Sequence, residues 1–490
     1  MRKSKPILFL LILCLAVTLC VPALAVDTPA NYSAGGEAQP APDIHARCAL
    51  LCDLESGQTY YARNADQKAY PASLTKIMTV LLALEALDRG EVQLADQITA
   101  GADARQGLDE ESSTAGIQPG ETMTFEQYPY CAMISSANEA CNVIGAHLAG
   151  SIDAFVQRMN DRAAELGCKG THFMNPHGMP DDNHYTTAAD LRLITEEALK
   201  YPLFETISNT LSYSIPATNM SDARVLQNTN GLINPNAVMY PNYLYEPAAG
   251  IKTGHTNAAG YCLISTAEKN TVKLLCIVLG SDTSEKDDGT LDFHNFTDTI
   301  DLYEWLYNHF SIQTVVSADT PMADVAVEMG SDADRVTVHP QADLAAVLPN
   351  DTDLSLYEKK ITIFSERDET PVVAPVRAGD VLGELEVVSK DGQVLGTIPL
   401  VASVDVSLSH AVFLKQGLHN FFAKPVVLIA LLLVLAVVIL YLISYIRYQR
   451  RRRLRAQEMR RRRQQEEALY RRQQEEAMRR EFEGRGTRRR

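Results

Sequence analysis

Residues 73–90 read SLTKIMTVLLALEALDRG, the most apolar stretch of the chain apart from one apolar run near each terminus. The stretch follows Pro71, is rich in leucine and ends at Gly90, which is the pattern of a buried helix. Ser73 and Lys76 stand at its start, and residues three positions apart lie on the same face of a helix. The sequence therefore predicts a serine hydroxyl and a lysine amine in contact at the beginning of a core helix.

A serine–lysine pair of this kind can carry nucleophilic chemistry. A serine hydroxyl is a weak nucleophile until a base accepts its proton. A lysine can be that base only when burial or a nearby cation lowers its pKa. The spacing S-x-x-K is common by chance, and a helix-start serine beside a solvated lysine is its ordinary explanation. An apolar helix is nevertheless an unusual place for a solvated lysine.

Small polar residues interrupt a second apolar run, CAMISSANEACNVIG, at Ser136-Ala137-Asn138. Such residues cost stability when they are buried without hydrogen-bond partners. A loop that offers a hydroxyl and an amide to a substrate would explain them, and so would a helix N-cap before Glu139. The sequence leaves both interpretations open.

A third motif, Lys252-Thr253-Gly254, lies in the strand-like segment AAGIKTGHTNAAGYCLIS. Lysine and threonine side chains can bind a carboxylate, and Gly254 would leave room for a substrate backbone along the strand. The motifs follow one another at offsets of 60 positions from Lys76 to Ser136 and 114 positions from Asn138 to Lys252. Each motif is weak alone, but the three in this order form a specific combination.

The residues around these motifs predict an α/β (α+β) body over residues 46–310, with an antiparallel sheet flanked by helices. A turn at Glu55-Ser56-Gly57 separates two strand-like runs and indicates a β-hairpin. The other expected elements are helices at 71–89, 125–149, 152–166, 188–200 and 293–310, and strands at 249–268 and 271–280. Since strands stand at both ends of this region, the predicted sheet joins distant parts of the chain.

Beyond residue 310 the chain changes to short alternating segments such as DRVTVHP and KKITIFSE, separated by Gly, Asp and Pro. This pattern predicts a smaller all-β domain, β-sandwich-like, over residues 311–410. A juxtamembrane linker is expected at 411–424. It leads to 22 uncharged residues at 425–446, which are enough for one transmembrane helix.

The N-terminus has the layout of a secretory signal peptide over residues 1–25, with basic MRKSK, an apolar run and the cleavage pattern Ala-Leu-Ala. Residues 26–45 are rich in Pro, Ala and Gly and are expected to be a flexible linker. The arginine-dense side of a membrane span faces the cytoplasm. Both signals place the large body outside the membrane and the Arg/Glu-rich tail, residues 447–490, in the cytoplasm.

The predicted external body and the predicted cytoplasmic tail carry opposite net charges. The 45 Lys and Arg against 61 Asp and Glu give a net charge of −16. Residues 26–446 alone hold 24 basic and 54 acidic residues, a net of −30, whereas the tail at 447–490 carries +11. Such an acidic body argues against a positively charged surface that could bind nucleic acid, so no nucleic-acid partner is expected. The tail favours electrostatic contact with an anionic inner leaflet.

Cysteine and histidine patterns indicate no metal site. Seven cysteines remain after the predicted signal peptide, and their odd number and scattered spacing do not resemble a disulfide framework. Most lie in apolar segments and are expected to be small buried hydrophobes, although a pair between Cys48 and Cys52 stays open. No C-x-x-C, His/Cys cluster or H-E-x-x-H spacing is present, so no metal and no cofactor are expected.

The three motifs together resemble those of the low-molecular-weight penicillin-binding proteins, the secreted serine-type D-alanyl-D-alanine carboxypeptidases of bacteria. Flanking segments match their pattern as well: PASLTKIMT at 71–79, SSANEA at 135–140, NPHGMPDDNHYTTAADL at 175–191 and GIKTGHTNAAGYCLISTA at 250–267. The likeness covers residues 46–310, and 374–387 resembles their C-terminal β domain more loosely. Two departures stand out. Ala137 replaces the Asp of the related lactamase motif, and a full membrane span replaces the family's amphipathic surface helix.

The resemblance implies a role for each motif residue. Ser73 is the acylated nucleophile, and Lys76 is its general base, with a pKa that we expect a nearby Lys252 to lower. Ser136 is the third catalytic residue and relays protons. The implied substrate-binding residues are Asn138, Lys252, Thr253, Gly254 and His255. Backbone N–H groups of Ser73 and His255 would form the oxyanion hole. His177 falls in a family motif, where a structural role explains it equally well.

The implied substrate is a peptidoglycan stem peptide that ends in D-Ala-D-Ala, and the enzyme would remove the terminal D-Ala through an acyl-enzyme on Ser73. β-Lactam antibiotics are the implied inhibitors, and a bacterial cell membrane is the implied location. A β-lactamase or a DD-transpeptidase of the same fold stays an alternative, although no E-x-x-x-N stands out in residues 155–200. The non-enzyme alternative is a membrane-anchored wall-binding protein with an inactive site.

Overall fold

The structure is a computed structural model of the chain. It describes residues 31–32, 39–110, 112–390, 392 and 394–485. The predicted signal peptide at 1–25 lies outside the described residues, as do parts of the predicted linker at 26–45. A short ribbon of β1 (Asn31–Tyr32) and β2 (Gln39–Pro40) is described within that linker.

A five-stranded antiparallel sheet forms the centre of the region that carries the three motifs, in the order β4-β3-β11-β10-β9. Its strands are β3 (Cys48–Asp53), β4 (Thr59–Arg63), β9 (Ala248–Thr256), β10 (Gly260–Lys269) and β11 (Val272–Ser281). The hairpin predicted at Glu55-Ser56-Gly57 is confirmed as β3–β4. The run predicted at 249–268 is two strands, because the chain reverses between β9 and β10.

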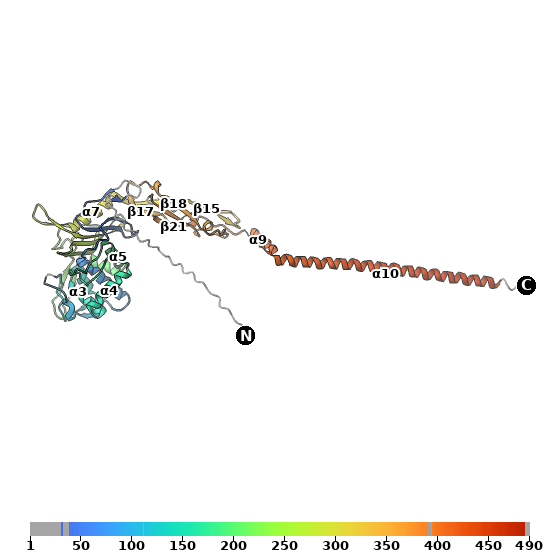
Figure 1. Ribbon diagram of the computed structural model, residues 1–490, viewed down its shortest axis with the longest axis horizontal. Helices are drawn as coiled ribbons and strands as arrows, with labels where there is room; N and C mark the ends of the chain where they lie inside the picture. Colours follow the sequence, from blue (N-terminus) through green and yellow to red (C-terminus); the bar gives the residue numbers. More distant parts are fainter. Residues whose placement is uncertain (1–30, 33–38, 111, 391, 393, 486–490) are drawn as a thin grey trace. The chain divides into compact units, whose positions relative to one another are not determined.

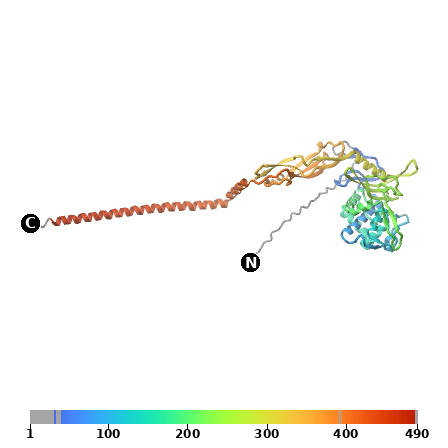
Figure 2. The same ribbon diagram turned by 180° about the vertical axis from the view of Figure 1, so that it is seen from behind.

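The sheet separates two hydrophobic cores, because successive side chains of a strand point to opposite faces. On β11, Leu275 and Ile277 belong to the core that contains α1 (Lys76–Asp88). Leu274 and Cys276 belong to the other core, with α7 (His294–His309). Figures 1 and 2 show α7 on one side of the sheet and the blue-green helices on the opposite side.

The helices on the larger side follow the predictions closely, with two interruptions. They are the 3₁₀ turn η1 (Ala72–Thr75), α1, α2 (Gln127–Ile134), α3 (Asn138–Ala149), α4 (Ile152–Glu165), α5 (Ala188–Leu199) and α6 (Pro202–Asn209). The helix predicted at 71–89 begins as a 3₁₀ turn rather than an α-helix. The helix predicted at 125–149 is broken, because Ser136 has φ +59° and an α-helix requires a negative φ. No motif signalled α6.

Short elements complete this region. They are the ribbons β5 (Gln97–Thr99) with β6 (Thr122–Thr124), β7 (Ser212–Ile215) with β8 (Arg224–Gln227), and β12 (Thr283–Glu285) with β13 (Leu291–Phe293), and the 3₁₀ turn η2 (Ala102–Arg105).

Residues 310–402 consist mainly of strands, as the alternating sequence predicts. A six-stranded sheet has the order β18-β20-β21-β16-β15-β19, and β14 pairs with β17. These strands are β14 (Phe310–Val316), β15 (Ala323–Glu328), β16 (Arg335–Pro340), β17 (Leu344–Pro349), β18 (Glu358–Ile363), β19 (Val372–Val373), β20 (Val381–Val388) and β21 (Val394–Ala402). Two single helical turns, η3 (Leu354–Leu356) and α8 (Phe364–Arg367), lie between them. The smaller all-β domain of the predicted fold class is therefore confirmed.

Two helices follow the strands. The segment predicted as a juxtamembrane linker forms α9 (His410–Ala423), and the apolar run opens α10 (Pro425–Arg485). In α10 an 18-residue window has a mean hydropathy of 3.5 and none of it is buried, so by length and composition the helix can cross a membrane. The Arg/Glu-rich residues continue the same helix to Arg485.

All seven cysteines of the described residues are free thiols, and six of them are buried. The expectation of small buried hydrophobes is confirmed, and Cys48 and Cys52 are not paired.

The packing around α1 predicts the effect of shortening one of its side chains. Leu81 is 0 % exposed, so Leu81→Ala should lower the free energy of unfolding by about 2–5 kcal/mol. Leu244, 59 % exposed, provides the matched control, since Leu244→Ala should change it by less than about 0.5 kcal/mol. Trp305 is the only tryptophan and is buried in this body, so denaturation followed by its fluorescence makes the measurement. Equal effects of the two substitutions would contradict the packing.

Candidate active site

The fold brings the three predicted motifs together. Ser73 lies in η1 and Lys76 is the first residue of α1. Ser136 stands in the break between α2 and α3, and Lys252 lies on β9, one of the two edge strands of the sheet. Asn138 opens α3. These parts of the chain are far apart in sequence and meet at the start of α1.

Three side chains form a connected hydrogen-bond chain. Lys76 Nζ lies 2.7 Å from Ser73 Oγ, and Ser136 Oγ donates to Ser73 Oγ at 3.0 Å. Lys76 Nζ also donates to the carbonyl oxygen of His177 at 2.8 Å. Ser73 is half-buried, whereas Lys76 is 0 % exposed. A reachable hydroxyl is thus placed between a buried amine and a second hydroxyl.

The environment of Lys76 suits a base. Burial removes the water that would solvate an ammonium ion, and it lowers the Lys76 pKa to about 8, whereas Cys141 and Glu139 act in the opposite direction. The predicted direction of the pKa shift is therefore right, but burial lowers the pKa, not the charge of Lys252. An amine with such a pKa is largely neutral in mildly alkaline solution and can accept a proton.

Lys252 is the second buried lysine, 1 % exposed. Burial and then the charge of Lys76 hold its pKa well below the usual value for lysine. Its Nζ donates to the carbonyl oxygen of Thr253 at 3.0 Å. Two ammonium ions cannot both be buried here without a counter-charge, so burial favours the neutral form of at least one of the two amines.

Two residues next to the nucleophile, Ala72 and Ser136, have left-handed backbone conformations. Ala72, directly before Ser73, has φ +47°, and Ser136 has φ +59°. A residue with a Cβ adopts this region at a cost of about 1–2 kcal/mol. The break at Ser136 is therefore a loop that presents a hydroxyl. The helix N-cap interpretation is wrong, because Ala137 occupies the N-cap position without a side-chain hydrogen bond.

Two glycines allow the backbones around Ser73 to approach closely. A Cβ on Gly178 would lie 1.8 Å from the carbonyl oxygen of Ala72, so no other residue fits there. A Cβ on Gly254 would lie 3.2 Å from Ser73 N and 3.2 Å from Pro71 O. Gly254 therefore lets β9 lie against the backbone of the nucleophile, and the room expected for a substrate backbone along the strand stays a prediction.

Asn138 and Glu139 secure the loop that precedes α2. The Asn138 N–H donates to the carbonyl oxygen of Ser113 at 2.9 Å. Glu139 Oε1 accepts from Thr114 Oγ1 at 2.6 Å and from the Ala115 N–H at 2.7 Å. The side-chain oxygen of Asn138 is buried without a hydrogen-bond partner among the described residues, which leaves it available to a ligand.

His255 and His177 differ in what they contribute. His255 is exposed and its ring stacks on Tyr261, with centroids 4.1 Å apart. His177 is buried, and its backbone oxygen, not its ring, contacts Lys76. A structural role for the His177 ring is consistent with this arrangement.

Two residues without a predicted role also lie near the site, Thr229 outside the quoted motifs and His184 within the segment 175–191. Thr229 Oγ1 lies 2.9 Å from Thr253 Oγ1, so a second hydroxyl stands beside the Lys252-Thr253 pair. His184 Nδ1 accepts from the Met174 N–H at 3.2 Å, so its Nε2 carries the proton toward Thr75 Oγ1 at 2.9 Å. Thr229 and His184 lie in loops, where hydrophobic periodicity gives no signal.

Comparisons with known proteins agree with this geometry. The sequence model of a family described as D-alanyl-D-alanine carboxypeptidase matches residues 35–283, and one described as penicillin-binding protein 5, C-terminal domain, matches residues 310–407. D-alanyl-D-alanine carboxypeptidase DacF of Bacillus subtilis is 29% identical over 76% of this chain and 90% of its own length. DacB2 of Mycobacterium tuberculosis is 31% identical over 49% of this chain and 76% of its own length.

A solved structure is similar in fold and sequence. Penicillin-binding protein 5 from Haemophilus influenzae has a TM-score of 0.56 and 25% identity, and the match covers 75% of this chain and 98% of that one. The similarity extends across the catalytic-type body and the strands that follow it.

The strain at Ser136 predicts a difference between two substitutions. Both Ser136→Ala and Ser136→Gly remove the hydroxyl, but only glycine adopts φ +59° without strain. We expect the glycine variant to be more stable than the alanine variant by about 1 kcal/mol, after the extra chain entropy of glycine is included. Denaturation followed by Trp305 fluorescence measures the difference. An alanine variant as stable as the glycine variant would show that the backbone is unstrained.

Proposed function

The chain belongs to the D-alanyl-D-alanine carboxypeptidase family, and on that premise we propose that it removes the terminal D-Ala from peptidoglycan stem peptides through an acyl-enzyme on Ser73. The observation that carries the proposal is the placement of Ser73 Oγ between the buried amine of Lys76 and the hydroxyl of Ser136. This arrangement supplies a nucleophile, a base of lowered pKa and a proton relay in one connected chain.

Acylation follows from these contacts. Ser73 Oγ attacks the carbonyl carbon of the penultimate D-Ala, and its proton passes to neutral Lys76 Nζ. The tetrahedral intermediate collapses as the C–N bond breaks, and the departing amine of the last D-Ala takes a proton through Ser136. Water then hydrolyses the ester on Ser73. Backbone N–H groups of Ser73 and His255 are the proposed oxyanion hole, and the close approach at Gly254 supports it.

Substrate binding is assigned to the edge of the sheet. The terminal carboxylate would meet Lys252 and Thr253, which are buried, and the Thr229 hydroxyl beside them. An anion there offsets the cost of burying the Lys252 charge. Since β9 is an edge strand, the substrate backbone can pair alongside it. The free side-chain oxygen of Asn138 is available to a peptide N–H.

The alternative enzymes share the serine chemistry and differ in the second step. A β-lactamase needs rapid deacylation, usually by water positioned on a carboxylate. Among the residues that the structure describes, Ser73 Oγ hydrogen-bonds to Lys76 and Ser136 and to no carboxylate, which favours a peptidase. A transpeptidase would transfer the acyl group to an amine instead of water, and product analysis with an amine acceptor separates the two.

We also propose that α10 anchors the enzyme in a bacterial cell membrane, with the body outside and the tail in the cytoplasm. The apolar start of α10 is long enough to span the bilayer, and the arginines that follow it favour the cytoplasmic side.

The nucleophile is tested by covalent labelling with a fluorescent penicillin, because a β-lactam imitates D-Ala-D-Ala and acylates the same hydroxyl. We expect the full chain to be labelled and to release D-Ala from a peptide ending in D-Ala-D-Ala. Ser73→Ala should lose both activities, whereas Ser135→Ala, one residue from the relay, should keep them. A Ser73→Ala variant that still labels would falsify the assignment.

The lowered pKa of Lys76 predicts the pH dependence of acylation. Only the neutral amine accepts the proton, so the acylation rate should rise with pH and level off above about 8, where half of Lys76 is neutral. Below that point the rate should fall about tenfold per pH unit. Lys76→Arg cannot lose its charge and should be inactive throughout. Stopped-flow acylation from pH 6 upward makes the measurement, and a flat profile would contradict the role of Lys76.

The orientation of the span is tested by reporter fusions at the C-terminus. A fluorescent reporter that folds only in the cytoplasm should be active there, and an alkaline phosphatase reporter that needs export should be inactive. The opposite pattern would reverse the proposed orientation.

A further inference from the structure

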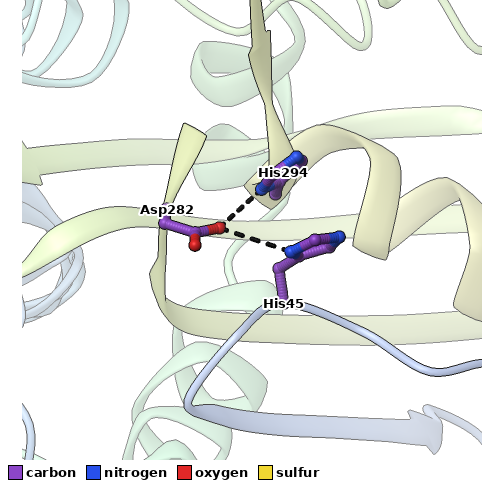
Figure 3. Close-up of side chains that lie close together, drawn as sticks. All are labelled: His45, Asp282 and His294. Atoms are coloured by element: carbon purple, nitrogen blue, oxygen red, sulfur yellow. Dashed lines mark hydrogen bonds and ion pairs between the residues drawn. The ribbon is translucent and has the colours of Figure 1, made fainter. Parts of the chain in front are cut away.

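A second group of side chains with chemical potential lies outside the proposed active site. His45 precedes β3, Asp282 directly follows β11, and His294 opens α7. Their ligand atoms all lie within 4.8 Å of one another. Figure 3 shows both imidazole rings turned toward the same carboxylate. His45 Nδ1 lies 3.4 Å and His294 Nδ1 2.5 Å from Asp282 Oδ1.

The fold fixes these residues relative to one another. Asp298, on the same helix as His294, is 2 % exposed, and its two oxygens accept the backbone N–H groups of His45 at 2.9 Å and Ala46 at 2.8 Å. Ser281 Oγ, next to Asp282, donates to the same carboxylate at 3.2 Å. One buried carboxylate thus ties the positions of His45 and Asp282 to α7, so the group is organised before any ligand arrives.

The donor set has the chemistry of a transition-metal site. Two imidazole nitrogens and one carboxylate oxygen are ligands that Zn²⁺ accepts, with a fourth position left for water. His294 Nε2 lies 2.9 Å from Ser284 Oγ, a contact that orients the ring, as outer hydrogen bonds do around bound metals.

We propose that His45, Asp282 and His294 form a binding site for one divalent transition-metal ion, with Zn²⁺ as the best match. Tetrahedral zinc with bonds of about 2.0–2.2 Å places its ligand atoms about 3.3–3.6 Å apart. The distance of 3.4 Å between His45 Nδ1 and Asp282 Oδ1 fits this value. The 2.5 Å contact of His294 must lengthen. The Asp282 side chain is 71 % exposed and the His45 side chain 53 %, so both can adjust.

The location suggests what the ion does. His45 is the last residue of the predicted linker, so an ion would fasten the entry of the chain to the end of β11 and to α7. Contacts through Tyr261 connect this group to the proposed active site. Tyr261 pairs with Ser281 across the sheet. Its ring contacts Phe293, which precedes His294, and also His255 of the proposed active site. The acidity of the body, −30 over residues 26–446, attracts cations to this surface.

Metal titration of the full chain in detergent, after treatment with a chelator, tests the site. We expect one Zn²⁺ per chain by isothermal titration calorimetry, and a melting temperature that rises with Zn²⁺ concentration, because the ion binds only the folded state. His45→Ala and Asp282→Asn, which change exposed side chains, should each weaken binding at least tenfold. His294→Ala should do the same, but its buried ring makes the two exposed variants the decisive ones.

His410→Ala, which removes an exposed histidine on α9, is the matched control and should bind Zn²⁺ like the unmodified chain. Labelling by fluorescent penicillin in the absence of metal should be unchanged in His45→Ala and Asp282→Asn, which verifies their folding and separates this site from the proposed enzyme activity. The proposal is overturned when the unmodified chain binds no Zn²⁺. It is equally overturned when either exposed variant binds Zn²⁺ as tightly as the unmodified chain, or when His410→Ala abolishes binding.

Discussion

The burial of the Lys76 amine against Ser73 is the constraint on which the rest of the catalytic body depends. A buried ammonium ion is costly, so the position favours the neutral amine and lowers its pKa to about 8. The surroundings then serve to hold that amine in place. The His177 carbonyl accepts from it, the left-handed Ser136 brings a second hydroxyl to the nucleophile, and Gly178 and Gly254 allow two other segments to close around η1. Strain and close packing gather where the chemistry is proposed, as expected of a functional site.

Much of this could be predicted from the sequence because it follows from local patterns. The buried helix after Pro71, the hairpin at Glu55-Ser56-Gly57, the strand-rich region after residue 310 and the family, from three motifs in order, are all confirmed. What escaped prediction depends on tertiary packing. The 3₁₀ start of the first helix, the positive φ of Ser136 and the hydroxyl of Thr229 leave no periodic signal. The depressed pKa of Lys76 was expected from the charge of Lys252, whereas its cause is burial, which only the folded core creates.

The metal site that we propose illustrates the same limit. Zinc motifs are recognised in a sequence by Cys and His residues that stand close together, and this sequence contains no such motif. The central sheet joins strands from both ends of the body. It therefore brings His45 beside Asp282 and His294, although His45 is distant from both in the sequence. The same antiparallel sheet carries Lys252 on its edge strand. The order of its strands therefore explains both the proposed active site and the proposed metal site, and the acidic charge of the body favours cations at the second.

Direct titration of the Lys76 side chain tests the central claim most closely. Lysines labelled with ¹³C at the ε-carbon report their protonation state by NMR, and comparison with Lys76→Arg identifies the resonance of Lys76. We expect a midpoint near pH 8 for Lys76 in the free protein, well separated from the surface lysines at about 10.4. A Lys76 resonance that titrates with those surface lysines would contradict it, because the amine would then be charged when Ser73 must lose its proton.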